Sequence, residues 1–167
     1  MSLKLGTLVL AVAVIALVSA AETRAQVPAG GSQVEAYYAF NNAPLWFPRG
    51  MPTPGANALP AILRRAQLDG FDDGPALAAQ VEQAIATVHS DPSATMQMDR
   101  VLSFAWVRYV RLLERRMPGF EYADDWGAPR RETAIDILSR AAQPEQLQLI
   151  LKIASVNPLY DKFRNAL

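Results

Sequence analysis

Residue types that support catalysis are scarce in this sequence. The chain of 167 residues has no cysteine and one histidine, His89. This excludes a thiol nucleophile, a disulfide framework, a cysteine-ligated zinc and a multi-histidine metal site, so we expect no metal and no cofactor. Ser90 and Asp91 follow His89, but adjacent side chains do not converge into a catalytic triad. We interpret His89 as a helix C-terminal residue favoured by the helix dipole.

A short acidic and aromatic segment is the next candidate. It contains Glu121, Tyr122, Asp124, Asp125 and Trp126. The main interpretation is a solvated turn. Two alternatives stay open: a loop that contacts a sugar or cation through Tyr122, Asp124, Asp125 and Trp126, and a hydrolase that uses Glu121, Asp124 or Asp125. Hydrolysis by two carboxylates needs a separation across a cleft that the spacing does not define.

An apolar cluster interrupts a proline-rich segment. Leu45, Trp46 and Phe47 lie between Asn41 and Gly55, where four prolines predict a loop. Aromatic residues are more often part of the core, and that interpretation stays open. An apolar cluster in a loop also suits an interface, so we name Leu45, Trp46 and Phe47 as candidate partner-binding residues.

Arginines recur along one predicted helix. Arg108, Arg111 and Arg115 follow the i, i+3, i+7 spacing of a single face, and Arg116 comes next. A solvated face paired with nearby acids is the main interpretation, and attraction of an anionic polymer is the alternative. The chain has zero formal net charge, which gives no electrostatic footprint for nucleic acid.

Helical periodicity dominates the chain after residue 31, and no strand alternation appears. We expect an all-α single domain of about seven helices. The spacing of Ser32 and Glu35 predicts a capping box for the first helix. Two helices are predicted next: one from Asn57, with Pro60 in its first turn, to a stop at Gly70, and one from an Asp73 cap to Ser90. A long helix should follow from a Ser93 cap to about Arg116. Three more helices are predicted from about 130 to 142, from Pro144 and from Asn157-Pro158. The helix after Ser93 is apolar on most sides, which predicts a central position.

Residues 1–25 have the pattern of a secretory signal peptide. Lys4 precedes a largely apolar run from Leu5 to Val18, shorter than the roughly 20 residues of a membrane-spanning helix. We expect cleavage after Ala25, or alternatively after Ala21, with an uncleaved anchor as the competing interpretation. The expected product is residues 26–167, a periplasmic or secreted domain with no stable membrane span.

Several short motifs, taken in order, resemble one family. They are Tyr37-Tyr38, Asn41-Asn42, Ala43-Pro44-Leu45-Trp46, Asp69-Gly70-Phe71-Asp72, and the tail from Asn157-Pro158-Leu159-Tyr160 to Ala166-Leu167. From Val34 to Leu167 the chain is similar to the N-terminal scaffold domain of periplasmic L,D-transpeptidases. That family places its nucleophilic cysteine in a separate catalytic domain, in a Ser/Thr-His-Gly-Cys motif. With no cysteine here, the resemblance carries over no catalytic residue. It implies a non-catalytic accessory domain of peptidoglycan cross-linking that binds either a transpeptidase catalytic protein or peptidoglycan.

Overall fold

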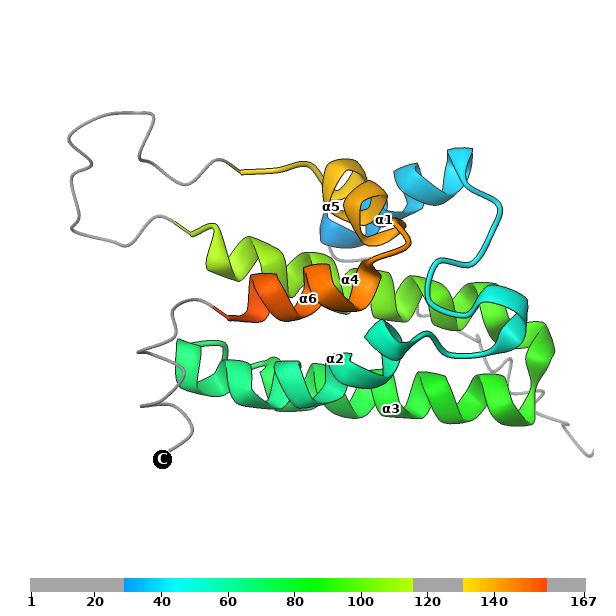
Figure 1. Ribbon diagram of the computed structural model, residues 1–167, viewed down its shortest axis with the longest axis horizontal. Coiled ribbons are helices and arrows are strands. Elements are labelled where there is room, and N and C mark those ends of the chain that lie inside the picture. The colour runs from blue at the N-terminus through cyan, green and yellow to red at the C-terminus, as the bar shows by residue number, and fades with distance from the viewer. Residues whose placement is uncertain (1–28, 116–130, 156–167) are drawn as a thin grey trace, which may run out of the picture.

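The computed structural model describes residues 29–115 and 131–155, and these residues form an all-α domain without strands (Figure 1). The helices are α1 (Ala29–Phe40), α2 (Pro54–Arg65), α3 (Gly74–Ser90), α4 (Thr95–Leu113), α5 (Ala134–Ala141) and α6 (Gln146–Ala154). The predicted fold class is confirmed. The helix expected at Asn157-Pro158 and the proposed signal peptide lie outside the described residues. No helix in the described ranges is long and apolar enough to cross a membrane.

Helix α4 occupies the centre of the bundle, as predicted from its apolar residues on most sides. It contacts α3 on one side and α1 and α5 on the other, while α2 packs against both α3 and α6 (Figure 1). Its fully buried side chains include Leu102, Trp106 and Tyr109. A helix buried on several faces can hold segments from both ends of the chain in fixed positions.

Helix α2 begins three residues earlier than the sequence analysis predicts. Thr53 is its N-cap, and the Thr53 hydroxyl accepts a hydrogen bond from the backbone amide of Ala56 at 3.0 Å. Pro54 therefore takes the first helical position. The placement of Pro60 in the first turn is wrong: this proline lies inside the helix and is buried. Gly70 ends the following 3-10 turn (Ala66–Asp69) at a φ of 79°, which confirms the predicted stop.

Three predicted caps differ from the structure. Helix α1 already includes Ser32, so the predicted capping box is wrong, and Glu35 instead forms an ion pair with Arg100. Ser93 lies in a 3-10 turn (Pro92–Ala94) before α4, where it donates to the side chain of Asp91. Asp73 takes the N-cap position of α3 but makes no capping hydrogen bond. Glu35 and Asp73 thus pair with distant arginines of α4, Arg100 and Arg108, which local spacing does not reveal.

The two C-terminal described helices, α5 and α6, each expose one large aliphatic side chain. In α5 the buried isoleucine is Ile137, while Ile135 is 42% exposed. In α6 the side chain of Leu151 is 49% exposed, and Gln146 is buried instead. Both helices are short, so a small rotation changes which residues reach the core. The exposed Ile135 and the buried Gln146 both border surface hollows described below.

Candidate functional site

The carboxylate of Asp99 holds the loop before α2 against α4. Asp99 has no exposed surface. Its oxygens accept hydrogen bonds from the backbone amides of Leu45 at 2.9 Å, Trp46 at 2.7 Å and Phe47 at 3.2 Å. A buried loop amide is costly without an acceptor, so one side chain satisfies three of them. The loop is therefore anchored through its backbone.

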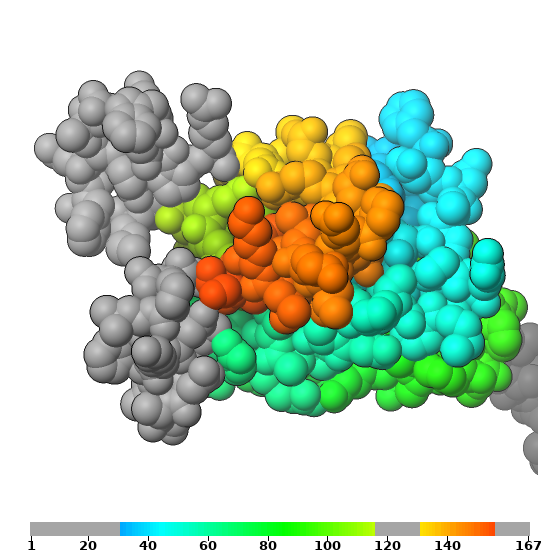
Figure 2. Space-filling view, in the orientation of Figure 1, coloured from blue at the N-terminus to red at the C-terminus, as the bar shows by residue number. Residues whose placement is uncertain are grey.

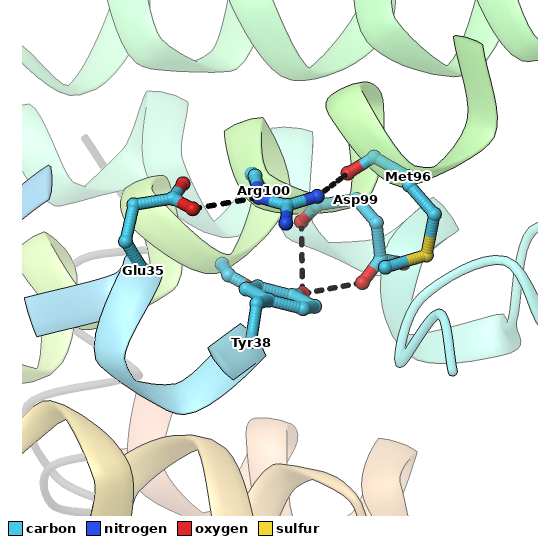
Figure 3. A network of polar contacts seen from close by, with 6 residues as sticks. Glu35, Tyr38, Met96, Asp99 and Arg100 are labelled. Carbon is cyan, nitrogen blue, oxygen red and sulfur yellow. Dashed lines mark hydrogen bonds and ion pairs between the residues drawn. The ribbon is translucent and has the colours of Figure 1, made fainter. Parts of the chain in front are cut away.

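A chain of hydroxyl groups completes this network. The Tyr38 hydroxyl donates to the Asp99 carboxylate, so the Ser103 hydroxyl, 2.7 Å away, donates to Tyr38. The indole Nε1 of Trp46 in turn donates to the Ser103 oxygen at 2.9 Å. Figure 3 shows Tyr38 pointing from α1 toward Asp99 on α4. Every donor in this hydroxyl network has an acceptor, and successive hydrogen bonds in such a network strengthen one another in a low-dielectric interior.

Burial and charge set the protonation states of this network. Burial raises the pKa of Asp99, while the hydrogen bonds from Tyr38 and from the loop amides act in the opposite direction. Burial and the charge of Asp99 together raise the pKa of Tyr38 well above its ordinary value. Tyr38 therefore remains a protonated donor. The guanidinium of Arg100 lies 4.7 Å from the Tyr38 ring centre and donates to Glu35 and to the Met96 carbonyl (Figure 3).

This network positions the loop and offers no site for a ligand. Asp99 and Ser103 are fully buried, and Tyr38 is 3% exposed, so a substrate has no access to them. The same finding corrects the candidate partner-binding residues: Trp46 and Phe47 each have 0% exposure and belong to the core of this chain. A partner cannot touch those two side chains without opening the fold. Leu45 is half-buried and remains at the surface.

A groove of about 760 Å³ lies beside this anchored loop. One wall comes from residues 37–55 and the other from the α5–α6 turn, residues 141–148, and Figure 2 shows these cyan and orange segments adjoining. None of the lining residues is acidic or basic, and amides are frequent among them: Asn41, Asn42, Gln143, Gln146 and Gln148. Phe40 also lines the groove and is 86% exposed. The surface is thus neutral, rich in amide donors and acceptors, and carries one open aromatic ring.

Some amides of the groove are structural and others are available. Gln146 accepts from the Thr53 hydroxyl at 2.6 Å and donates to the Ala141 carbonyl at 2.9 Å, which joins the two walls. Asn41 donates to the Tyr37 carbonyl at 2.9 Å. Asn42 and Gln148 are exposed, and their side-chain amides form no hydrogen bond with any described residue. The groove therefore combines a fixed framework with free amide groups at its edge.

The other candidates of the sequence analysis fall elsewhere. His89 lies in the last turn of α3, where its Nδ1 lies 2.8 Å from the Ile85 carbonyl, as expected for a histidine near a helix C-terminus. The acidic segment with Glu121, Tyr122, Asp124, Asp125 and Trp126 lies outside the described residues. Within the described residues no three metal-ligand side chains come together.

Sequence reasoning missed Asp99 and the groove. A detectable signal existed for Asp99: it lies four residues before Ser103 on the face that also carries Trp106, so two polar residues share a core-facing stripe. The groove gave no such signal, because Phe40 and Gln148 are brought together only by tertiary packing.

Comparisons with known proteins support the resemblance described above. A family model described as a scaffold domain matches residues 32–167. No curated protein and no solved structure matches the chain. The matched range covers all six described helices except the first residues of α1, and it includes both walls of the groove. The chain therefore belongs to the scaffold-domain family, in agreement with its resemblance to the scaffold domain of L,D-transpeptidases.

Proposed function

We propose that this chain is an exported, non-catalytic scaffold domain of cell-wall cross-linking that binds peptidoglycan glycan strands in the amide-lined groove. Membership of the scaffold-domain family supports the scaffold role. The choice of a glycan as the ligand rests on the neutral groove, with its free amides and its exposed phenylalanine. Its export rests on the signal-peptide pattern of residues 1–25.

The chemistry of the groove suits a polysaccharide. An amide presents a donor and an acceptor side by side, which matches the hydroxyl and acetamido groups of amino sugars. The open ring of Phe40 offers an apolar surface for the C–H face of a sugar. Since no charged side chain lines the groove, an uncharged glycan enters it without an ionic group losing water.

Co-sedimentation with murein sacculi tests this proposal. We expect the protein to pellet with sacculi, and the Phe40→Ala/Asn42→Ala variant to remain largely in the supernatant. Leu68→Ala is the matched control, because Leu68 is an exposed leucine outside the groove, in the 3-10 turn after α2. Equal pelleting of all three proteins would place the binding elsewhere. Failure of all three to pellet, with a transpeptidase captured instead, would favour a protein partner.

The rival hydrolase, using Glu121, Asp124 or Asp125, makes a different prediction in the same assay. A hydrolase releases soluble muropeptides from the pellet. We expect the muropeptide profile after incubation to match that of untreated sacculi. A changed profile that Asp125→Asn abolishes would replace the scaffold proposal by a catalytic one.

A further inference from the structure

A second surface region gathers positive charge. A hollow of about 500 Å³ lies between the start of α3 and the C-terminal half of α4. Four arginines line it, namely Arg108, Arg111, Arg115 and Arg131, together with Phe71, Phe104 and Leu112 and a single acid, Asp73. We call this the arginine hollow. Four cations and one anion leave it strongly positive.

The arginine hollow continues into a neighbouring one. Arg111 and Arg131 also line a second hollow of about 500 Å³ between α1 and the start of α5. Its wall contains Ala36 and Ile135, and Ile135 is 42% exposed. The two hollows adjoin at Arg111 and Arg131, and together we call them the channel. It is positive at the arginine hollow, while its other part combines the apolar Ala36 and Ile135 with one acid, Glu132.

The arginines of this channel outnumber its acids: four arginines face Asp73 and Glu132, and Glu132 already pairs with Arg140. Arg108 forms an ion pair with Asp73 at 2.5 Å. Arg111 donates to the neutral amide of Gln33 and interacts electrostatically with Glu114, while its buried Nε has no hydrogen-bond acceptor among the residues that the structure describes. Arg115 and Arg131 are exposed and form no ion pair with another described residue. Of the predicted arginine face, Arg108 is thus paired with an acid and Arg115 is solvated without a described ion-pair partner, while Arg116 lies outside the described residues.

We propose that this channel binds an acidic peptide segment of a protein partner. Guanidinium groups bind carboxylates through paired N–H donors. The channel presents several arginines, so several carboxylates of one peptide can each meet a guanidinium group. Ile135 and Ala36 offer an apolar surface for a neighbouring side chain of the same peptide. The proposal is independent of glycan binding in the groove.

The experiment measures fluorescence anisotropy of a labelled, end-blocked peptide of about ten residues that alternates Glu and Leu. A second peptide carries Gln in place of each Glu. We expect the Glu peptide to bind at least about tenfold more tightly than the Gln peptide, with an affinity that falls as salt rises. Equal binding of both peptides would overturn the proposal.

Variants locate the binding. We expect Arg115→Gln/Arg131→Gln, at two exposed positions, to weaken binding of the Glu peptide about fivefold or more. Arg64→Gln is the matched control, because Arg64 is half-exposed and pairs with Glu82 outside the channel. An equal loss in Arg64→Gln would show non-specific charge attraction and overturn the proposal. Displacement of the peptide by inorganic phosphate at low millimolar concentration, with ionic strength held constant, would overturn it in favour of a phosphate site.

Discussion

The Asp99 carboxylate on α4 accepts a hydrogen bond of 2.7 Å from the backbone amide of Trp46, 53 residues earlier in the chain. With the amides of Leu45 and Phe47, this bond fixes the loop that forms one wall of the groove. A single buried side chain thus couples the centre of the bundle to the proposed ligand surface.

Removal of the Asp99 carboxylate should cost much of the stability. In Asp99→Ala, three loop amides and the Tyr38 hydroxyl lose their acceptor in the interior. We expect a loss of about 3–5 kcal/mol in the free energy of unfolding, measured by urea denaturation. Asp72→Ala, at an exposed position, should stay within about 0.5 kcal/mol of the wild type. Similar midpoints for both variants would contradict the role of Asp99.

The raised pKa of Tyr38 predicts a loss of stability at alkaline pH. Below pH about 10 the tyrosine is protonated in both states, and its contribution is complete. Above that pH the unfolded chain releases the proton while the folded chain retains it, so stability falls by about 1.4 kcal/mol per pH unit. Tyr38→Phe has no hydroxyl proton to release at this position, so its stability lacks this part of the alkaline decline.

Urea denaturation of both proteins at several alkaline pH values measures the effect. Tyr38→Phe is less stable at neutral pH, because it loses the hydrogen bond to Asp99. The difference from the wild type should shrink as pH rises above about 10. Tyr37, whose pKa is also raised by burial, stays in both proteins and does not affect the difference. Parallel pH profiles would show that Tyr38 ionises as freely in the folded state as in the unfolded chain.

Trp46 and Phe40 should have opposite mutational effects. Trp46 has 0% exposure and donates to Ser103, so Trp46→Ala should lower the free energy of unfolding by about 3–5 kcal/mol. Phe40 is 86% exposed, so Phe40→Ala should change the free energy of unfolding by less than about 0.5 kcal/mol. Thermal denaturation of both variants checks the contrast. A stable Trp46→Ala protein would restore Trp46 as a candidate for partner contact.

Close packing of α2 on α3 depends on Gly74. A Cβ at this position would lie 2.3 Å from the backbone carbonyl oxygen of Leu63, which cannot move without shifting α2. We expect Gly74→Ala to destabilise by about 1–3 kcal/mol. At Gly70 no atom lies within 4 Å of such a Cβ, and only the positive φ of 79° opposes alanine, at a cost of about 1 kcal/mol. Calorimetry should show the lower melting temperature for Gly74→Ala.

The fold class follows from local signals in the sequence. The stop at Gly70 and the helix that ends at Ser90 are set by nearby glycine, proline and apolar spacing. The cap predictions at Ser32 and Ser93 were wrong because the same polar residues also occur inside helices and turns. Glu35, for example, pairs with Arg100, 65 residues away, and sequence spacing carries no trace of that contact.

The candidate site was predictable only in part. The loop around Trp46 was singled out correctly as unusual, but its burial depends on Asp99, which belongs to a distant helix. The groove joins residues near Phe40 to residues near Gln148, and the arginine hollow joins α4 to Arg131. Both surfaces arise from packing between segments far apart in the chain, which periodicity within one segment does not encode.

Binding of uncharged N-acetylglucosamine oligomers tests the central claim most directly, because these oligomers carry the acetamido sugars of the glycan without stem peptides, protein partners or the free lactyl carboxylates of peptide-free murein strands. Isothermal titration of the protein with such oligomers should give saturable binding. Phe40→Ala/Asn42→Ala should weaken that binding about tenfold or more, while Leu68→Ala should bind as the wild type does. Equal affinity of the groove variant and the wild type, with both proteins folded, would contradict the assignment of the groove to glycan.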